Sequence, residues 1–154
     1  MDTISKVARS ALMARIRNKD SKPERALRSA MHRTGLRFRL HRTDLPGTPD
    51  IVLPATKIAI FVHGCFWHQH ARCKLASSPR SNTEYWLPKL QRNVERDRRV
   101  AKALRQLGWA VLTVWECQTR KEISLAVALK RIHTSVRKRK DKNATQSILR
   151  RRRA

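Results

Sequence analysis

The stretch from Ile58 to Cys73, IAIFVHGCFWHQHARC, concentrates the side chains that can do chemistry. Its apolar beginning, Ile58 to Val62, has the β-branched and aromatic content of a buried strand. Histidines, cysteines and two adjacent aromatic residues follow directly, in the order His63, Cys65, Phe66, Trp67, His68, His70 and Cys73. Imidazoles and thiols at the end of a strand indicate a metal site or a catalytic site.

Three possible zinc ligands lie on this loop, in the pattern Cys65-x4-His70-x2-Cys73, and a fourth, Cys117, follows the apolar run Trp109–Trp115. Three thiolates and one imidazole close the tetrahedral shell of Zn2+ and leave no position open for catalysis. The prediction is therefore a structural zinc site that ties the loop to the end of another strand. The alternative is three unrelated buried thiols, because the spacing is not that of a stock zinc finger.

A second set of candidate residues contains carboxylates and imidazoles. Asp50 begins one predicted strand, His63 ends its hairpin neighbour, and Glu24 near the start of a helix is an acid that could reach the same edge. Mg2+ takes carboxylate, water and phosphate oxygens, and imidazole titrates near neutral pH. Asp50 is the predicted magnesium ligand, and His68 or His63 the general base, of a phosphodiester hydrolysis. The alternative is that Asp50 is only a turn residue.

The 154 residues include 36 Lys+Arg against 11 Asp+Glu, a formal net charge of +25. Such a charge indicates a polyanionic partner, although composition alone does not separate a DNA enzyme from a ribosomal-type basic protein. On a basic surface, the aromatic residues Phe66, Trp67 and Trp86 could insert between base steps and bend a duplex. Packing in a core is the alternative for the aromatic pair.

Several classes of protein are disfavoured by the sequence. No apolar stretch approaches the roughly 20 residues of a membrane span, and the first residues lack the pattern of a secretory signal. Three cysteines, an odd number, argue against a disulfide framework and for a reducing compartment. The expected location is the cytoplasm, in association with the nucleoid.

The chain is expected to form one domain, residues 21–133, between a basic N-terminal arm, residues 1–20, and a basic tail, residues 134–154, expected to be disordered. The order helix, three strands, helix, strand, helix predicts an α/β fold, an α+β mixed sheet flanked by helices. Ser21 and Glu24 predict a capping box with Pro23 in the first turn, Gly35 stops that helix, and Pro88 kinks or restarts a later one. The expected strands are 36–40, 50–53, 57–62 and 109–115, and the last helix is 122–133.

Four segments together resemble the very short patch repair (Vsr) endonucleases: Pro-Gly-Thr-Pro-Asp at 46–50, Phe-Val-His-Gly-Cys-Phe-Trp-His at 61–68, Glu-Tyr-Trp at 84–86 and Asn-Val-Glu-Arg-Asp-Arg-Arg at 93–99. The similarity spans about Arg9 to His133. It implies a fold related to type II restriction endonucleases, Mg2+ for chemistry and a structural zinc. It also implies strand-specific nicking 5′ of the T in a T:G mismatch that arises when 5-methylcytosine deaminates.

The resemblance also implies roles for individual residues. Asp50 matches the magnesium ligand, with the backbone carbonyl of Val62 as partner ligand; His68 matches the general base, His63 an assisting histidine, and Glu24 an acid that reaches the metal through water. The zinc positions fall on Cys65, His70, Cys73 and Cys117, and the intercalating positions on Phe66, Trp67 and Trp86.

The implied partners are mismatched double-stranded DNA, mismatch-repair proteins and a cytosine-5 methyltransferase. A monomer is expected because a lone mismatch has no two-fold symmetry. The tail, residues 134–154, lies outside the resemblance and is interpreted as a nonspecific DNA anchor. Two other functions stay open: a restriction-like or mobile-element nuclease of the same fold acting on matched DNA, and a noncatalytic zinc-containing nucleic-acid-binding module.

Overall fold

A mixed β-sheet forms the centre of the computed structural model, which describes residues 7–8, 11–12 and 19–153. Within these residues the sheet has four strands in the order β1-β2-β3-β4. Antiparallel pairing joins β1 to β2 and β2 to β3, whereas β3 and β4 are parallel. The strands are β1 (Arg39–Leu40), β2 (Ile51–Leu53), β3 (Ile58–His63) and β4 (Ala110–Trp115).

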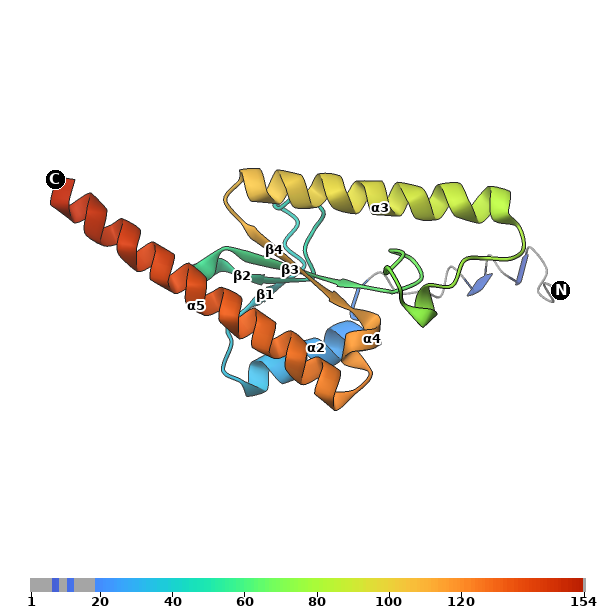
Figure 1. Cartoon of the computed structure of the whole chain (residues 1–154), viewed down its shortest axis with the longest axis horizontal. Helices are drawn as coiled ribbons and strands as arrows, with labels where there is room; N and C mark the ends of the chain where they lie inside the picture. The colour runs from blue at the N-terminus through green and yellow to red at the C-terminus, as the bar shows by residue number, and fades with distance from the viewer. Residues whose placement is uncertain (1–6, 9–10, 13–18, 154) are drawn as a thin grey trace.

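Helices cover both faces of this sheet (Figure 1). One face packs against α3 (Thr83–Gln106), and the other packs against α2 (Lys22–Arg33) and α5 (Glu122–Arg153). A short helix, α4 (Glu116–Thr119), links β4 to α5, and single 3-10 turns lie at Pro54–Thr56 and Lys74–Ala76. The α+β mixed class predicted from the sequence is confirmed, and its relation to restriction endonucleases stays a prediction.

The apolar run in β3 is continuous because this strand is buried on both faces. Ile58 and Ile60 pack in the core beneath α2 and α5, while Ala59 and Phe61 pack in the core beneath α3. The alternation follows the two-residue period of a strand. The antiparallel hairpin of β2 and β3 was predicted correctly, with Ile51 opposite Ile60.

The predicted start and end of α2 are confirmed. Glu24 N donates to Ser21 Oγ and Ser21 N donates to Glu24 Oε1, which completes the capping box. Gly35 follows the C-cap with φ +81°, a left-handed conformation that glycine adopts without a Cβ clash. The helix thus holds Glu24 at a fixed place near its N-terminus.

Of the two expectations at Pro88, a kink or a restart, the structure excludes the restart, because α3 runs through this residue from Thr83 to Gln106. Tyr85 N and Trp86 N both donate to Asn82 O, so the first turn forms before the proline. A proline inside a helix removes its own backbone donor and crowds the carbonyl four residues earlier, but α3 continues past Pro88. One continuous helix therefore carries Trp86 and Asp97.

The prediction of a disordered tail is wrong, as is the predicted end of the last helix at His133: α5 continues to Arg153. Lysine, arginine and glutamine are good helix formers, so the basic sequence favours continuation. Val136 is buried in the core, and Arg139 Nη2 donates to Lys57 O and Gly108 O, which attach the helix to the domain.

Two further expectations concern the N-terminal part of the chain. The first strand is shorter than predicted, since only Arg39–Leu40 of the expected residues 36–40 pairs with β2. Most of the expected N-terminal arm, residues 1–20, lies outside the described residues. Among the described residues, the helices are too short or too polar to cross a bilayer.

A close approach between Gly47 and α3 gives a test of how this helix is seated. Gly47 has φ +72°, and a Cβ built there would lie 2.4 Å from Val100 Cγ1. Gly47→Ala is therefore expected to lower the free energy of unfolding by about 2–3 kcal/mol, because backbone strain and overpacking add. Urea denaturation measures this change.

Gly35→Ala is the matched control. Gly35 also has a positive φ, +81°, but nothing lies within 4 Å of its Cβ position, so it is expected to lose only about 1 kcal/mol for backbone strain. Equal losses in the two variants would contradict the proposed packing of Val100 against Gly47.

Candidate functional site

The parallel pairing of β3 with β4 determines where the site residues meet. His63 and Trp115, the last residues of the two strands, are partners in the register. Because parallel strands end at the same edge of a sheet, the loop after β3 and helix α4 after β4 begin side by side. All the predicted zinc ligands lie on these two segments.

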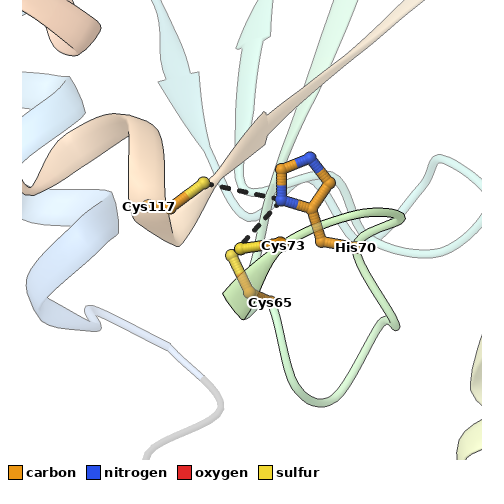
Figure 2. A group of neighbouring side chains, drawn as sticks. All are labelled: Cys65, His70, Cys73 and Cys117. Carbon is orange, nitrogen blue, oxygen red and sulfur yellow. Dashed lines mark hydrogen bonds between the residues drawn. The ribbon is translucent and has the colours of Figure 1, made fainter. Parts of the chain in front are cut away.

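The four predicted zinc ligands form one cluster (Figure 2). Their ligand atoms all lie within 4.8 Å of one another. His70 Nδ1 lies 3.6 Å from Cys65 Sγ and 3.5 Å from Cys117 Sγ. Tetrahedral Zn2+ with ordinary Zn–S and Zn–N bonds places sulfur and nitrogen about 3.6 Å apart. The donor set and the spacing therefore fit a tetrahedral metal ion that His70 would bind through Nδ1.

The surroundings of the cluster disfavour free thiolates at two of its three cysteines, Cys65 and Cys117. Burial raises the pKa of the Cys65 thiol to about 12 and also raises the pKa of Cys117. The hydrogen bond from the Leu75 backbone lowers the pKa of Cys73. Since metals bind the thiolate form, a divalent cation would offset the cost of ionising the buried sulfurs.

A second cluster joins His63, His68 and Asp97. His68 Nδ1 lies 2.6 Å from Asp97 Oδ2, and the two imidazole rings stack with centroids 3.8 Å apart. Burial alone would raise the pKa of Asp97, but the His68 hydrogen bond lowers it below its usual value. An ionised carboxylate can only accept, so Nδ1–H donates and Nε2 of His68 is left free to take a proton.

The two histidines of this cluster differ in their electrostatics. Burial, followed by the nearby His68, lowers the pKa of His63 to about 4. His63 is therefore neutral near pH 7 and can act there as a hydrogen-bonding group rather than as a cation. The stacked pair thus combines a base oriented by Asp97 with a neutral imidazole beside it.

Asp97 was missing from the residues that the sequence analysis assigned to the site. It lies on the apolar face of α3, in line with Val94, Ala101 and Leu104. An acid in such a stripe is the sequence signal that could have identified it, because burying a carboxylate without a partner is costly. Only the fold shows that its partner is His68.

Asp50 directly precedes β2, which pairs with β3, the strand that ends at His63. Val62 N donates to Asp50 Oδ2 at 2.7 Å, which directs the carboxylate toward the end of β3. Burial and, to a smaller extent, the nearby charge of Glu24 raise the pKa of Asp50 to about 6, although the Val62 hydrogen bond acts in the opposite direction. A cation at this carboxylate would reverse both effects, so the donor set of Asp50 and the Val62 carbonyl fits a hard cation such as Mg2+.

Glu24 is almost fully buried, at 4% exposure. Asp20 N and Ser21 Oγ donate to its two carboxylate oxygens at 3.1 and 2.9 Å, and His41 Nε2 lies 3.7 Å from Oε2. The segment before α2 therefore closes over Glu24. His41, which no sequence pattern had pointed to, lies beside it.

These residues surround one cavity of about 840 Å3. It is lined by all four predicted catalytic residues and by further polar side chains that the sequence analysis did not assign to the site. The lining includes Glu24, Asp50, His63 and His68, and in addition Lys19, His41, Lys89, Asn93, Arg96, Asp97 and Glu116. The structure thus brings together carboxylates, imidazoles and basic side chains, the groups that hydrolysis of a phosphodiester needs.

The three predicted intercalating residues form an aromatic cluster at this cavity. The ring centroids are 5.4 Å apart for Phe66–Trp67, 5.6 Å for Phe66–Trp86 and 5.8 Å for Trp67–Trp86. Lys89 Nζ lies 5.6 Å from the Trp67 ring and 5.7 Å from the Trp86 ring. Asn93 Nδ2 also donates to Trp67 O. Trp67, Lys89 and Asn93 all line the cavity.

Trp115 connects the two clusters through ring contacts. Its indole stacks on His70 with centroids 4.1 Å apart and an interplanar angle of 6°. Its edge also meets His63 at 5.5 Å. Because His63 in turn stacks on His68, one row of packed rings joins the cysteine cluster to the histidine that Asp97 orients.

The carboxylates, imidazoles and basic side chains around this cavity are compatible with an endonuclease, and sequence comparisons show that the chain is related to proteins of this class. The profile of the family described as DNA mismatch endonuclease Vsr matches residues 1–75. The chain is 50% identical over 117 residues to the type II nicking enzyme V.XorIIP of Xanthomonas oryzae pv. oryzae, covering 76% of this chain and 85% of that one. The chain belongs to the Vsr family of endonucleases, as the resemblance predicted.

Two other relatives extend the match. The DNA mismatch endonuclease Vsr of Escherichia coli is 46% identical over 119 residues, 77% of this chain and 76% of its own length. The type II nicking enzyme V.NmeAIP of Neisseria meningitidis is 37% identical over 140 residues, 91% of this chain and 97% of its own.

Removing one cysteine ligand tests the metal site. Cys117→Ser is expected to lose bound zinc and to lower the free energy of unfolding by about 3 kcal/mol. This is the stabilisation that a metal ion gives when its free concentration is about 100 times its dissociation constant. Metal analysis of the purified protein and thermal unfolding measure the two effects. A chelator should destabilise the wild type to the same level and leave the variant unchanged. A variant without zinc that melts like the wild type would contradict a structural role.

Replacing Asp50 tests its electrostatic environment. Its folded-state pKa is raised, so the ionised form costs stability above about pH 6, and this cost vanishes below the unfolded value near pH 4. Asp50→Asn keeps an oxygen for Val62 N–H and is expected to gain up to about 3 kcal/mol at pH 7.5 in EDTA. The gain should disappear near pH 4.

Urea unfolding of both proteins at the two pH values measures this difference. Adding Mg2+ at pH 7.5 should stabilise the wild type and leave Asp50→Asn unchanged, because the variant has lost the anionic ligand. A variant that is less stable than the wild type at both pH values in EDTA would contradict the prediction that burial of the Asp50 carboxylate costs stability.

Proposed function

We propose that this chain is a strand-specific nicking endonuclease that hydrolyses the phosphodiester 5′ of the thymine in a T:G mismatch. Such mismatches arise when 5-methylcytosine deaminates, and the nick would initiate very short patch repair. The observation that carries the proposal is that the aromatic cluster of Phe66, Trp67 and Trp86 adjoins the cavity that holds Asp50 and His68. A group suited to open a base step thus lies beside groups suited to cut the backbone.

The chemistry follows from the residues around the cavity. Mg2+, held by Asp50 and the Val62 carbonyl with Glu24 acting through water, would offset the charge that develops on the phosphate. His68 Nε2 takes a proton from the attacking water, and Asp97 holds the ring in the tautomer that permits this. The products are a 3′-hydroxyl and a 5′-phosphate, and Lys89 and Arg96 on the cavity wall suit an anionic substrate.

The aromatic cluster accounts for selectivity by a physical argument. A mismatched step costs less to unstack than a matched one, so insertion of an aromatic wedge favours mismatched DNA before any base is read. Lys89 and Asn93 lie beside Trp67 on the cavity wall and can donate hydrogen bonds to exposed base edges. The names of the family and of its Escherichia coli member support the choice of a mismatch as substrate.

The enzyme is proposed to act as a monomer, because a single mismatch presents no two-fold axis. Mismatch-repair proteins and a cytosine-5 methyltransferase remain proposed partners, from family resemblance. The proposed location is the cytoplasm, in association with the nucleoid.

A nicking assay on end-labelled duplexes tests the function. The duplexes differ only in having T:G, T:A or C:G at one position, within several methylation-type contexts that include CTWGG. With Mg2+, we expect a nick 5′ of T in the T:G duplex alone, and no cutting in EDTA. Asp50→Ala and His68→Ala should each lower the rate by about 100-fold or more while binding of the mismatched duplex is retained.

The other outcomes separate the remaining functions. Cutting of matched duplexes at a comparable rate would identify a restriction-like or mobile-element nuclease. Tight binding without scission under any divalent cation would identify a noncatalytic module and overturn the roles of Asp50 and His68. The relatives named nicking enzymes make a cut in one strand the expected product.

A further inference from the structure

The C-terminal part of α5 extends beyond the domain that holds the site. In Figure 1 the helix passes the end of the sheet and projects away from it. Among the residues of α5 whose exposure the structure describes, Val136 is the last buried one, and every residue of 141–152 is exposed. Residues 137–152, called here the projecting helix, contain eight lysines and arginines against one aspartate.

The projecting helix leaves the domain at a fixed point. Arg139 Nη2 donates to Gly108 O at 2.6 Å and to Lys57 O at 3.2 Å. Lys57 precedes β3, whereas His63 ends this strand, so the attachment lies at the opposite end of β3 from the catalytic cavity. Six residues of strand correspond to about 20 Å, and the 13 residues from Arg139 to Arg152 add about 20 Å of helix.

The side chains of the projecting helix do not form a surface for docking on another helix. Its large apolar residues, Ile148 and Leu149, are adjacent in sequence and point about 100° apart. They are 54% and 52% exposed. The small Ala144 lies four residues before Ile148, and no second large apolar residue at a spacing of three or four extends either into a stripe. The basic side chains instead surround the helix on all sides.

We infer that the projecting helix is a second DNA contact, which binds the phosphate backbone of the same duplex at a distance from the cut. The charge is complementary to DNA and is distributed without a preferred face, as suits a sequence-independent phosphate contact. Since the catalytic domain already holds the duplex, binding of the helix is an intramolecular event at high effective concentration. This inference rests on the proposed function only in that the domain binds DNA.

Repulsion between its own basic side chains destabilises the projecting helix, and binding to DNA would reduce this repulsion. Like charges three or four residues apart on a helix repel each other by a few tenths of a kcal/mol per pair. Such pairs include Arg137 with Lys140 and Lys138 with Lys142. Phosphates that neutralise basic side chains of the helix would relieve this repulsion and release counterions. An acidic protein could neutralise the same charge, but nothing places such a partner next to the helix, whereas the substrate is already there.

The test compares DNA binding by the full chain and by the triple variant Arg150→Gln, Arg151→Gln, Arg152→Gln. Binding to a matched duplex of about 40 base pairs is measured without divalent cation at several salt concentrations. Three lost phosphate contacts should reduce the slope of log K against log[salt] by about 2.7. Affinity at low salt should fall tenfold or more. Glutamine favours helix about as well as arginine, so the helix itself is kept.

Two control variants separate charge from other causes. Replacing the same three arginines by lysine keeps the charge and should keep the salt slope. The double variant Ile148→Gln, Leu149→Gln removes the exposed apolar groups and should also keep it. Circular dichroism of each variant establishes that helix content is unchanged.

Duplex length gives an independent test. On a duplex of about 10 base pairs, which extends roughly 17 Å from its centre, the wild type and the triple glutamine variant should bind alike. An unchanged salt slope on the long duplex would overturn the inference, as would an equal loss of affinity on both lengths. Because the assay needs no cleavage and no mismatch, either result is independent of the nicking assay.

Discussion

The structure depends above all on the parallel pairing of β3 with β4. This pairing puts His63 opposite Trp115 and makes both strands end at the same edge of the sheet. The loop that carries Cys65, His70 and Cys73 can then meet Cys117 just beyond β4, although more than forty residues of chain separate them. A parallel connection needs a crossover, and α3 supplies it while carrying Asp97 and Trp86 to the same edge.

The two clusters at this edge have different proposed roles and are connected through Trp115. The cysteine cluster would fix a loop that has little regular structure, because four ligands from two segments restrict its movement. Trp115 packs between His70 and His63, so the orientation of the His63 and His68 imidazoles depends on the same packing. Asp97 then sets the tautomer of His68 from the opposite side. The loop that carries the cysteine cluster and the histidines at the cavity are thus connected by ring contacts that pass through Trp115.

Charge is distributed unevenly in relation to the cavity. Glu24 is buried and Asp50 is half-buried beside it, and desolvation, with a smaller effect of the Glu24 charge, disfavours ionisation of Asp50 in the absence of a cation. Basic side chains lie on the walls and, in greater number, on the projecting helix. An anionic backbone would be attracted over a wide surface, whereas a divalent cation would be attracted to one point. The two kinds of binding can therefore be weakened separately by substitution.

The sequence by itself determined the ligand types, the strand hairpin, the capping of α2 and the family, since these depend on residue identity and short spacings. It also identified Asp50, His63, His68, the four metal ligands and the aromatic residues as candidates.

It did not find Asp97, because a single acid in an apolar helical stripe acquires a role only when the fold places His68 beside it. It also did not find three other residues that line the cavity, His41, Lys89 and Asn93, because only the fold brings them there. The tail was misjudged because its composition resembles that of disordered segments, while Val136 and Arg139 attach the helix through contacts with residues distant in sequence. Tertiary structure decided which side chains became partners, because their contacts join segments that only the sheet brings together.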